Sequence, residues 1–247
     1  ASSLASSALH SAAYGAVAAA AATVLALPVA WSAIRHRSSL NVVIERGTFF
    51  VQGLPGLVIA LSLVYLAVRY TFAIYQRWEL LVLAYAIMFF PLSLVALRTS
   101  IAAAPVGLEE VGASLGRSRL VVATRVTLPL LAPGLAAAFC LVFISVITEL
   151  TATLLLLPIG ASTLATQFWS FQNDASDSAA APYAALMMAV AVVPGLVVAR
   201  WFHRLPSRAT AAVGPIAPSP VGAPSNSVDH ASGRKWTGLD LPAPGSQ

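Results

Sequence analysis

Charged side chains are scarce in this sequence. Of its 247 residues, 9% are Asp, Glu, Lys or Arg, whereas 58% are hydrophobic, and the mean hydropathy is +0.82. A water-soluble domain carries about 25% charged residues, so this chain lacks the polar atoms that a water-exposed surface needs. The scarcity excludes an ordinary soluble fold and predicts a protein whose solvent is the lipid bilayer.

Lysine and cysteine are nearly absent as well. Thirteen of the fourteen basic residues are Arg, scattered singly between apolar segments, which argues against nucleic-acid binding despite a net charge of +5. The lone Cys140 excludes an intrachain disulfide and a cysteine-based metal site. No Gly-x-x-x-x-Gly-Lys-Ser/Thr sequence occurs, and the four histidines are dispersed. We therefore predict a non-catalytic chain without a metal, cofactor or ATP site of its own.

Long apolar stretches predict an all-α, polytopic membrane bundle of about five transmembrane helices. They cover residues 10–34, 49–68, 80–97, 130–157 and 182–202. Each is close to the roughly 20 residues that cross a bilayer as a helix, and continuous apolarity excludes barrel strands, which alternate. The transmembrane domain is expected over residues 1–205. Residues 206–247 are rich in Pro, Ala, Ser and Gly and predict a disordered cytoplasmic tail.

The arginines predict the orientation in the membrane. One set of loops carries nearly all of them: Arg35, Arg37, Arg46, Arg98, Arg117, Arg119, Arg125, Arg204 and Arg208. The opposite set carries only Arg69 and Arg77, with Asp174 and Asp177. Because cytoplasmic loops are enriched in Lys and Arg, the first set is expected in the cytoplasm. The amino terminus of this chain is then outside and the carboxyl tail inside.

The longest polar interruption, residues 98–127, predicts two short helices separated by Gly116. Leu108, Val111 and Leu115 recur at helical spacing and give the first of these helices one apolar side. Glu110 lies in its opening turn, where the helix dipole favours an acidic side chain. Gly116 permits a sharp turn or the close approach of another backbone.

This loop resembles the signature of the permease subunits of binding-protein-dependent ABC importers. That signature is Glu-Ala-Ala, three residues, Gly, nine residues, then Ile-x-Leu-Pro. The matching positions here are Glu110, Val111, Gly112, Gly116, Val126, Leu128 and Pro129. Both spacings agree, the two alanines are replaced by Val111 and Gly112, and Val126 stands in place of the isoleucine. The resemblance implies that the loop inserts into a cleft on a cytoplasmic ATPase, with Glu110 as polar anchor, Leu115 packed in the cleft and Gly116 at the point of close contact. ATP would be bound by that partner.

The flanking helices are similar to those of ferric-iron importer permeases. The similar stretches are LPGLVIALSLVYL (residues 54–66), VTLPLLAPGL (126–135) and ELTATLLLLPIGASTLATQFWS (149–170). Those permeases hold two homologous halves in one chain. This sequence begins at Ala1 without a methionine or a signal peptide, and it resembles the second half.

The resemblance also implies partners, a location and a cargo. The partners are cytoplasmic ATP-binding subunits, a second permease half or subunit and an extracytoplasmic substrate-binding protein, at the bacterial inner membrane. Ferric iron is the favoured cargo. Thiamine, polyamines, phosphonates and oxyanions stay open because related permeases share the loop signature, and a secondary transporter is a less favoured alternative.

Glu149 is the single acidic residue inside a predicted span. A carboxylate in hydrocarbon is costly unless it faces protein or water. Together with Thr148 and Thr151, it is expected either to face the translocation path and support an outer gate, or to cap the packed outer ends of the helices. The loop at residues 158–181 is expected outside, as a receptor for the binding protein or as an interfacial aromatic belt.

Overall fold

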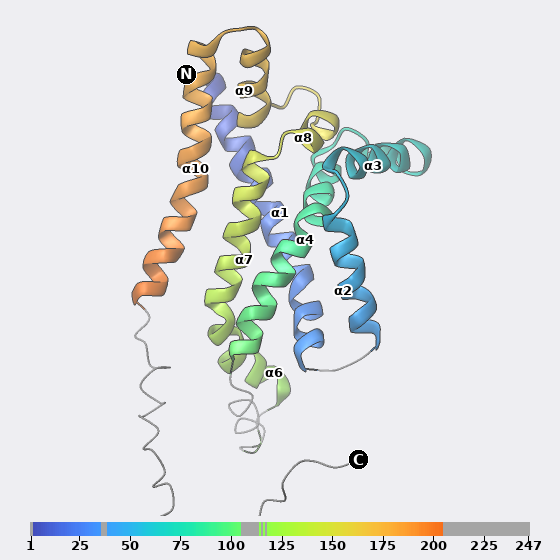
Figure 1. The fold of residues 1–247 in the computed structure, drawn as a ribbon, viewed down its shortest axis with the longest axis vertical. Helices are drawn as coiled ribbons and strands as arrows, with labels where there is room; N and C mark the ends of the chain where they lie inside the picture. The colour runs from blue at the N-terminus through green and yellow to red at the C-terminus, as the bar shows by residue number, and fades with distance from the viewer. Residues whose placement is uncertain (1, 36–38, 105–113, 115, 117, 205–247) are drawn as a thin grey trace, which may run out of the picture. The chain divides into compact units, whose positions relative to one another are not determined.

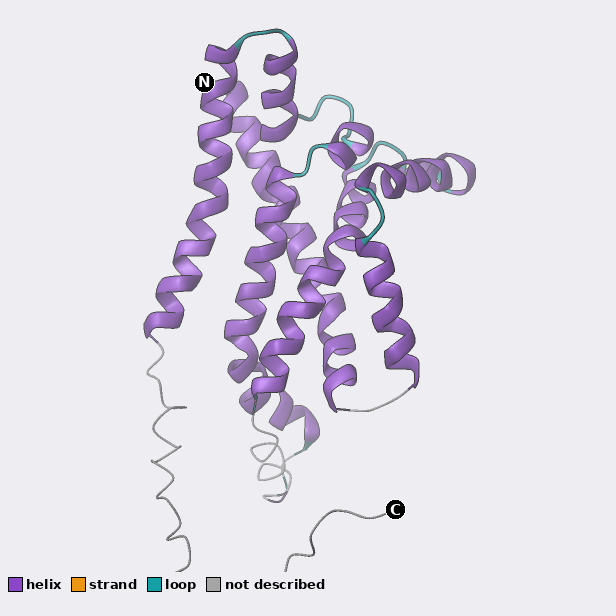
Figure 2. Ribbon diagram, viewed as in Figure 1, coloured by secondary structure: helices purple, strands orange, loops and turns teal. Residues whose placement is uncertain are grey.

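The computed structural model describes residues 2–35, 39–104, 114, 116 and 118–204, and all regular secondary structure in them is helical (Figures 1 and 2). The long helices are α1 (Ser2–Arg35), α2 (Ser39–Gln52), α3 (Gly56–Tyr70), α4 (Trp78–Ala103), α7 (Leu128–Thr148) and α10 (Asp177–Arg204). The shorter elements are η1 (Phe72–Ile74), α6 (Arg119–Val122), the π-helical η2 (Ala123–Thr127), α8 (Thr151–Leu156) and α9 (Leu164–Asn173). The expected tail, residues 206–247, lies outside the described residues.

Four of these helices are long and apolar enough to cross a membrane: α1, α4, α7 and α10. A fifth crossing exists if the bent pair α2 and α3 counts as one span. The predicted all-α membrane bundle of about five spans is thereby confirmed. Large apolar side chains on the outside of this bundle, such as Leu9, Val24 and Val192, are more than half exposed, which suits a surface that lipid covers.

Residues 49–68, the second predicted span, do not form a single straight helix. α2 ends at Gln52, a turn follows, and α3 leaves at an angle of 101°. Pro55 has no amide hydrogen and occupies the position before α3 with extended backbone angles (φ −59°, ψ 138°). Proline disfavours a helical conformation in the residue before it and is well placed at a helix start, so the apolar run bends here.

Other predicted boundaries also move. The expected span 130–157 is divided, because α7 ends at Thr148 and α8 begins at Thr151. α4 continues through Pro91 to Ala103, six residues past the expected end at position 97. The expected outer loop at 158–181 contains α9, whose amino end is closed by a capping box between Thr163 and Thr166. α10 begins at Asp177 rather than at position 182.

The core of the bundle lies between α1, α4 and α7. α1 presents a stripe of small, fully buried side chains to its neighbours: Ala18, Ala19, Ala22, Ala26 and Ala30. Small residues let helix backbones approach closely, which is how helices gain packing energy in lipid. Thr23 on α1 also accepts a hydrogen bond from Ser93 on α4 (Oγ to Oγ1, 3.5 Å). α1 and α4 therefore pack tightly along most of their lengths.

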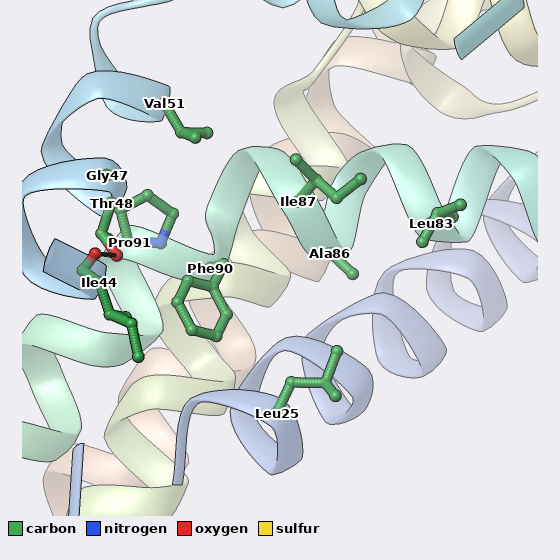
Figure 3. Close-up of a pocket in the computed structure, with 10 residues that line it drawn as sticks. All are labelled: Leu25, Ile44, Gly47, Thr48, Val51, Leu83, Ala86, Ile87, Phe90 and Pro91. Atoms are coloured by element: carbon green, nitrogen blue, oxygen red, sulfur yellow. Dashed lines mark hydrogen bonds between the residues drawn. The ribbon is translucent and has the colours of Figure 1, made fainter. Parts of the chain in front are cut away.

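An apolar cavity of about 450 Å³ lies between α2, α1 and α4 (Figure 3). Leu25 of α1, Ile44 and Val51 of α2, and Ile87 and Phe90 of α4 line it. None of its ten lining residues is charged, and the hydroxyl of its only threonine donates to a carbonyl of its own helix. Because nothing in this wall would bind an ion, the cavity is suited to hydrocarbon.

Candidate functional site

The loop that carries the importer signature leaves α4 at Ala104 and returns through α6 (Figure 1). α1 ends and α2 begins at the same end of the bundle, as the distribution of arginines along the chain predicts. Four predicted contact residues, Glu110, Val111, Gly112 and Leu115, lie outside the described residues. Their predicted role therefore stays a prediction, and the described part of the site is Gly116 with the two ends of the loop.

Gly116 adopts a left-handed backbone conformation with φ +71°. A side chain at this φ is strained, whereas glycine adopts it freely. Apart from its chain neighbours, no atom of the described residues lies within 4 Å of the place where a Cβ would stand. Of the two predicted uses of this glycine, the backbone angle supports the sharp turn.

The returning chain runs as one continuous helical path from α6 through η2 into α7. Ser118 directly precedes α6, and its Oγ accepts the amide hydrogen of Val121 at 3.4 Å. The five residues of η2 form a π-helical turn directly before Leu128 and Pro129. A proline ring clashes with the carbonyl four residues earlier, here that of Arg125, and a wider π turn relieves that clash. Such turns are frequent at functional sites.

α4 and α7 are in close contact near the loop, where Ser100 of α4 packs against the backbone of Gly134 in α7. A Cβ placed on Gly134 would lie 2.1 Å from Ser100 Oγ and 2.2 Å from Ser100 Cβ. Only glycine allows this approach, which joins the two helices that bear the loop. The sequence shows that Gly134 follows Pro133, yet no local pattern reveals that a neighbouring helix fills the missing side-chain volume.

At the other end of the bundle, Glu149 directly follows α7, and its side chain caps the start of α8. Its Oε1 accepts the amide hydrogen of Ala152 at 3.0 Å, in the first turn of α8. It also lies 3.6 Å from the place of a Cβ on Gly56, the first residue of α3. An anion is favoured at the amino end of a helix, so the carboxylate sits where two helices begin. This arrangement favours the capping interpretation of Glu149, and a role in the translocation path stays a prediction.

A buried hydroxyl pair stands beside Glu149. Tyr85 of α4 and Thr153 of α8 share a hydrogen bond of 2.6 Å, and the Thr153 hydroxyl also donates to the backbone carbonyl of Glu149. Ser11 of α1 accepts the amide hydrogen of Leu164 at 2.8 Å, which holds the start of α9. These bonds fix the short helices α8 and α9 onto α4 and α1.

The two threonines predicted to act with Glu149 are exposed in this chain. The Thr148 hydroxyl donates to the carbonyls of Ile144 and Ser145 in its own helix, at 3.2 Å each. The structure therefore places Glu149 in a capping network and leaves Thr148 and Thr151 outside it. Within the described ranges, no group of three or more His, Cys, Asp or Glu side chains is arranged to hold a metal ion.

Comparison with known proteins gives a consistent result. Residues 14–211 match the family described as "Binding-protein-dependent transport system inner membrane component". The Fe(3+)-transport system permease protein FbpB 2 of Haemophilus influenzae is 41% identical over 169 residues, which are 68% of this chain and 33% of that protein. The molybdenum transport system permease protein ModB of Escherichia coli is 31% identical over 132 residues, covering 52% of this chain and 57% of ModB.

The fold has a counterpart among solved structures. A chain of the MetNI methionine ABC transporter, in an inward-facing conformation, superposes with a TM-score of 0.63 at 15% identity, covering 80% of this chain and 95% of that one. At this identity the match shows the fold alone. The chain spans about a third to three fifths of the length of the curated relatives it matches. With four-fifths of its residues inside the family match, the chain belongs to the binding-protein-dependent transport system inner membrane components.

Proposed function

We propose that this chain is the membrane-spanning permease component of an ATP-driven ABC importer. The observation that carries the proposal is the family match over residues 14–211, which includes a loop of intact signature spacing between two core helices, α4 and α7. In this proposal the helix bundle forms part of the substrate path and hydrolyses nothing itself. ATP is bound by cytoplasmic partner subunits.

The proposed location is the bacterial inner membrane, with the loop between α4 and α7 in the cytoplasm. Support comes from the arginines, because Arg35, Arg98 and Arg125 lie on elements that meet at one end of the bundle, while Asp174 and Asp177 lie at the other. The amino terminus is then outside. A second permease half or subunit completes the path, and a soluble binding protein delivers the cargo to the outer end.

The proposed mechanism is alternating access. ATP closes two partner ATPases, the loop moves with them, and the bundle opens toward the outside. A ligand shifts such an equilibrium only by binding one state better than the other. Glu110 serves as the polar anchor in the ATPase cleft. Gly116 gives the turn its left-handed geometry and is the proposed point of close contact with the ATPase.

Ferric iron is the proposed cargo. Support comes from the 41% identity to an Fe(3+)-transport permease, against 31% to a molybdenum permease. The test is uptake by proteoliposomes that hold the complete complex, supplied with its binding protein and radioactive ferric iron or molybdate. Iron uptake that needs ATP and is unaffected by excess molybdate is expected. Uptake of molybdate alone would replace the cargo assignment and leave the importer proposal standing.

Co-purification with the cognate ATPase tests the coupling loop. Glu110→Arg and Gly116→Trp should each weaken ATPase binding by at least about tenfold, or about 1.4 kcal/mol. Glu109→Arg is the matched control, because it makes the same charge change one residue outside the signature and should bind nearly as well as the parent. Gly116→Ala strains the backbone without adding a bulky side chain, so it shows how much of the effect of Gly116→Trp on ATPase binding comes from strain alone. Full ATPase binding by both Glu110→Arg and Gly116→Trp would reject the proposed function.

A further inference from the structure

The carboxyl end of α1 contacts the point where the loop leaves α4. Trp31 and Arg35 are one helical turn apart and therefore lie on the same face of α1. The guanidinium of Arg35 stands 5.3 Å from the centre of the Trp31 ring, within the range of a cation–π interaction. The indole thus orients the guanidinium and reduces the number of conformations that the long side chain adopts.

The oriented guanidinium holds the end of α4. Arg35 Nη2 donates a hydrogen bond to the carbonyl oxygen of Ala104 at 3.3 Å. Ala104 closes α4 and is 7% exposed. The last carbonyls of a helix lack partners within the helix and carry partial negative charge, so a cation is well suited to bind there. Arg35 ties α1 to α4 at the residue where the loop begins.

The same segment of α1 also faces the point where the loop returns. Trp31 lines a mainly apolar cavity of about 310 Å³ together with Thr127, Leu128 and Leu131. Thr127 and Leu131 are 6% and 2% exposed. These residues end η2 and begin α7, so the segment of α1 that holds the departing end of the loop faces its returning end across this cavity.

We propose that Trp31 and Arg35 are positioning residues that clamp the departing end of the coupling loop onto α1. α4 and α7 are already joined above the loop by the Ser100–Gly134 contact, so the clamp makes three helices respond together when the loop is displaced. Without it, a displacement of the loop would reach α1 only through the packing of its alanine stripe on the neighbouring helices, and the carboxyl end of α1 would follow less. The inference rests on the proposed coupling function and adds the route by which force enters the bundle.

Hydrogen–deuterium exchange on the complete complex in lipid nanodiscs tests the clamp. The probe is ATP with vanadate, which holds the ATPases closed. In the parent, trapping should change deuterium uptake in peptides of the loop and of residues 20–35. In Arg35→Ala, the loop should still respond and the response of residues 20–35 should be lost. Arg35→Lys retains a cation that can donate to Ala104 and should restore part of the response.

Control variants distinguish a failure of the clamp from a failure of the proposed coupling function. Arg46→Gln removes an exposed arginine from the middle of α2 and should respond like the parent. If Arg35→Ala does not assemble, Trp31→Phe and Arg35→Lys give the answer, each with a reduced response. A full response of residues 20–35 in Arg35→Ala overturns the clamp. A parent loop that does not respond at all overturns the proposed coupling function instead.

Discussion

Replacing Gly134 by alanine should force α4 and α7 apart at the base of the coupling loop. The new Cβ would stand 2.2 Å from Ser100 Cβ, although ordinary contact begins at 3.4 Å. Because the position of Ser100 Cβ is set by the backbone, no change of rotamer relieves the overlap, and the helices must separate by roughly 1 Å. Overpacking of this kind typically costs about 1–3 kcal/mol, which outweighs the gain of up to about 1 kcal/mol from helix propensity.

The assay measures the midpoint of thermal unfolding in detergent, with circular dichroism as the signal. Gly195→Ala in α10 is the matched control, since its new methyl group would meet only Ile144 Cδ1 at 3.9 Å, and it should be neutral or stabilising. Second-site variants sharpen the test. Ser100→Gly leaves only the Cα at 3.7 Å and should rescue Gly134→Ala, whereas Ser100→Ala keeps the clashing Cβ and should not. Equal rescue by both, or a stable Gly134→Ala, would refute the reasoning.

Three further outcomes are expected at the outer end of the bundle. Glu149→Ala removes the cap on the Ala152 amide and should lower the free energy of unfolding by about 1 kcal/mol, whereas Glu149→Gln keeps an acceptor and should cost less in the same unfolding assay. Tyr85→Phe and Thr153→Val should show a coupling energy of roughly 0.6–1.7 kcal/mol in a double-mutant cycle, because they share one buried bond; a cycle that sums to zero contradicts this. Gly56→Ala should destabilise less than Gly134→Ala, since the one close approach of its new Cβ is to the flexible end of Met88, at 2.8 Å, and that side chain can move, while Glu149 Oε1 lies at an ordinary contact distance of 3.6 Å; an equal loss in unfolding midpoint would contradict the distinction.

Hydrophobic length and charge placement were sufficient to predict the type of fold. The stretches at 10–34 and 80–97 became α1 and α4 because lipid selects continuous apolarity, which a sequence displays directly. Continuity of a helix is a different property. The breaks at Pro55 and Glu149 fall inside apolar runs, and hydropathy does not register them. Length and composition predict that a segment lies in the membrane, but they do not predict whether it forms one straight helix.

The candidate site was predictable only where its chemistry is local. The left-handed turn at Gly116 followed from the residue type and its place in the motif. The contacts of Arg35 with Ala104 and of Gly134 with Ser100 join positions far apart in the chain, and a single sequence holds no record of which helices are neighbours. Arg35 was recognised as a charge that orients the chain, while its bond to the end of α4 became visible only in three dimensions.

The right-angled bend between α2 and α3 has a consequence for the lipid around the protein. α2 has 14 residues and rises about 21 Å, which is short of the roughly 30 Å thickness of the hydrocarbon layer. The two amides of the bend at Gly53 and Leu54 already donate to carbonyls of α2, at 3.1 Å each, so the turn brings few unpaired polar groups into the membrane. A helix this short thins the bilayer along its side of the bundle, at a cost of fractions of a kcal/mol per ångström. The membrane beside α2 should therefore be thinner than beside α4, whose 26 residues rise about 39 Å.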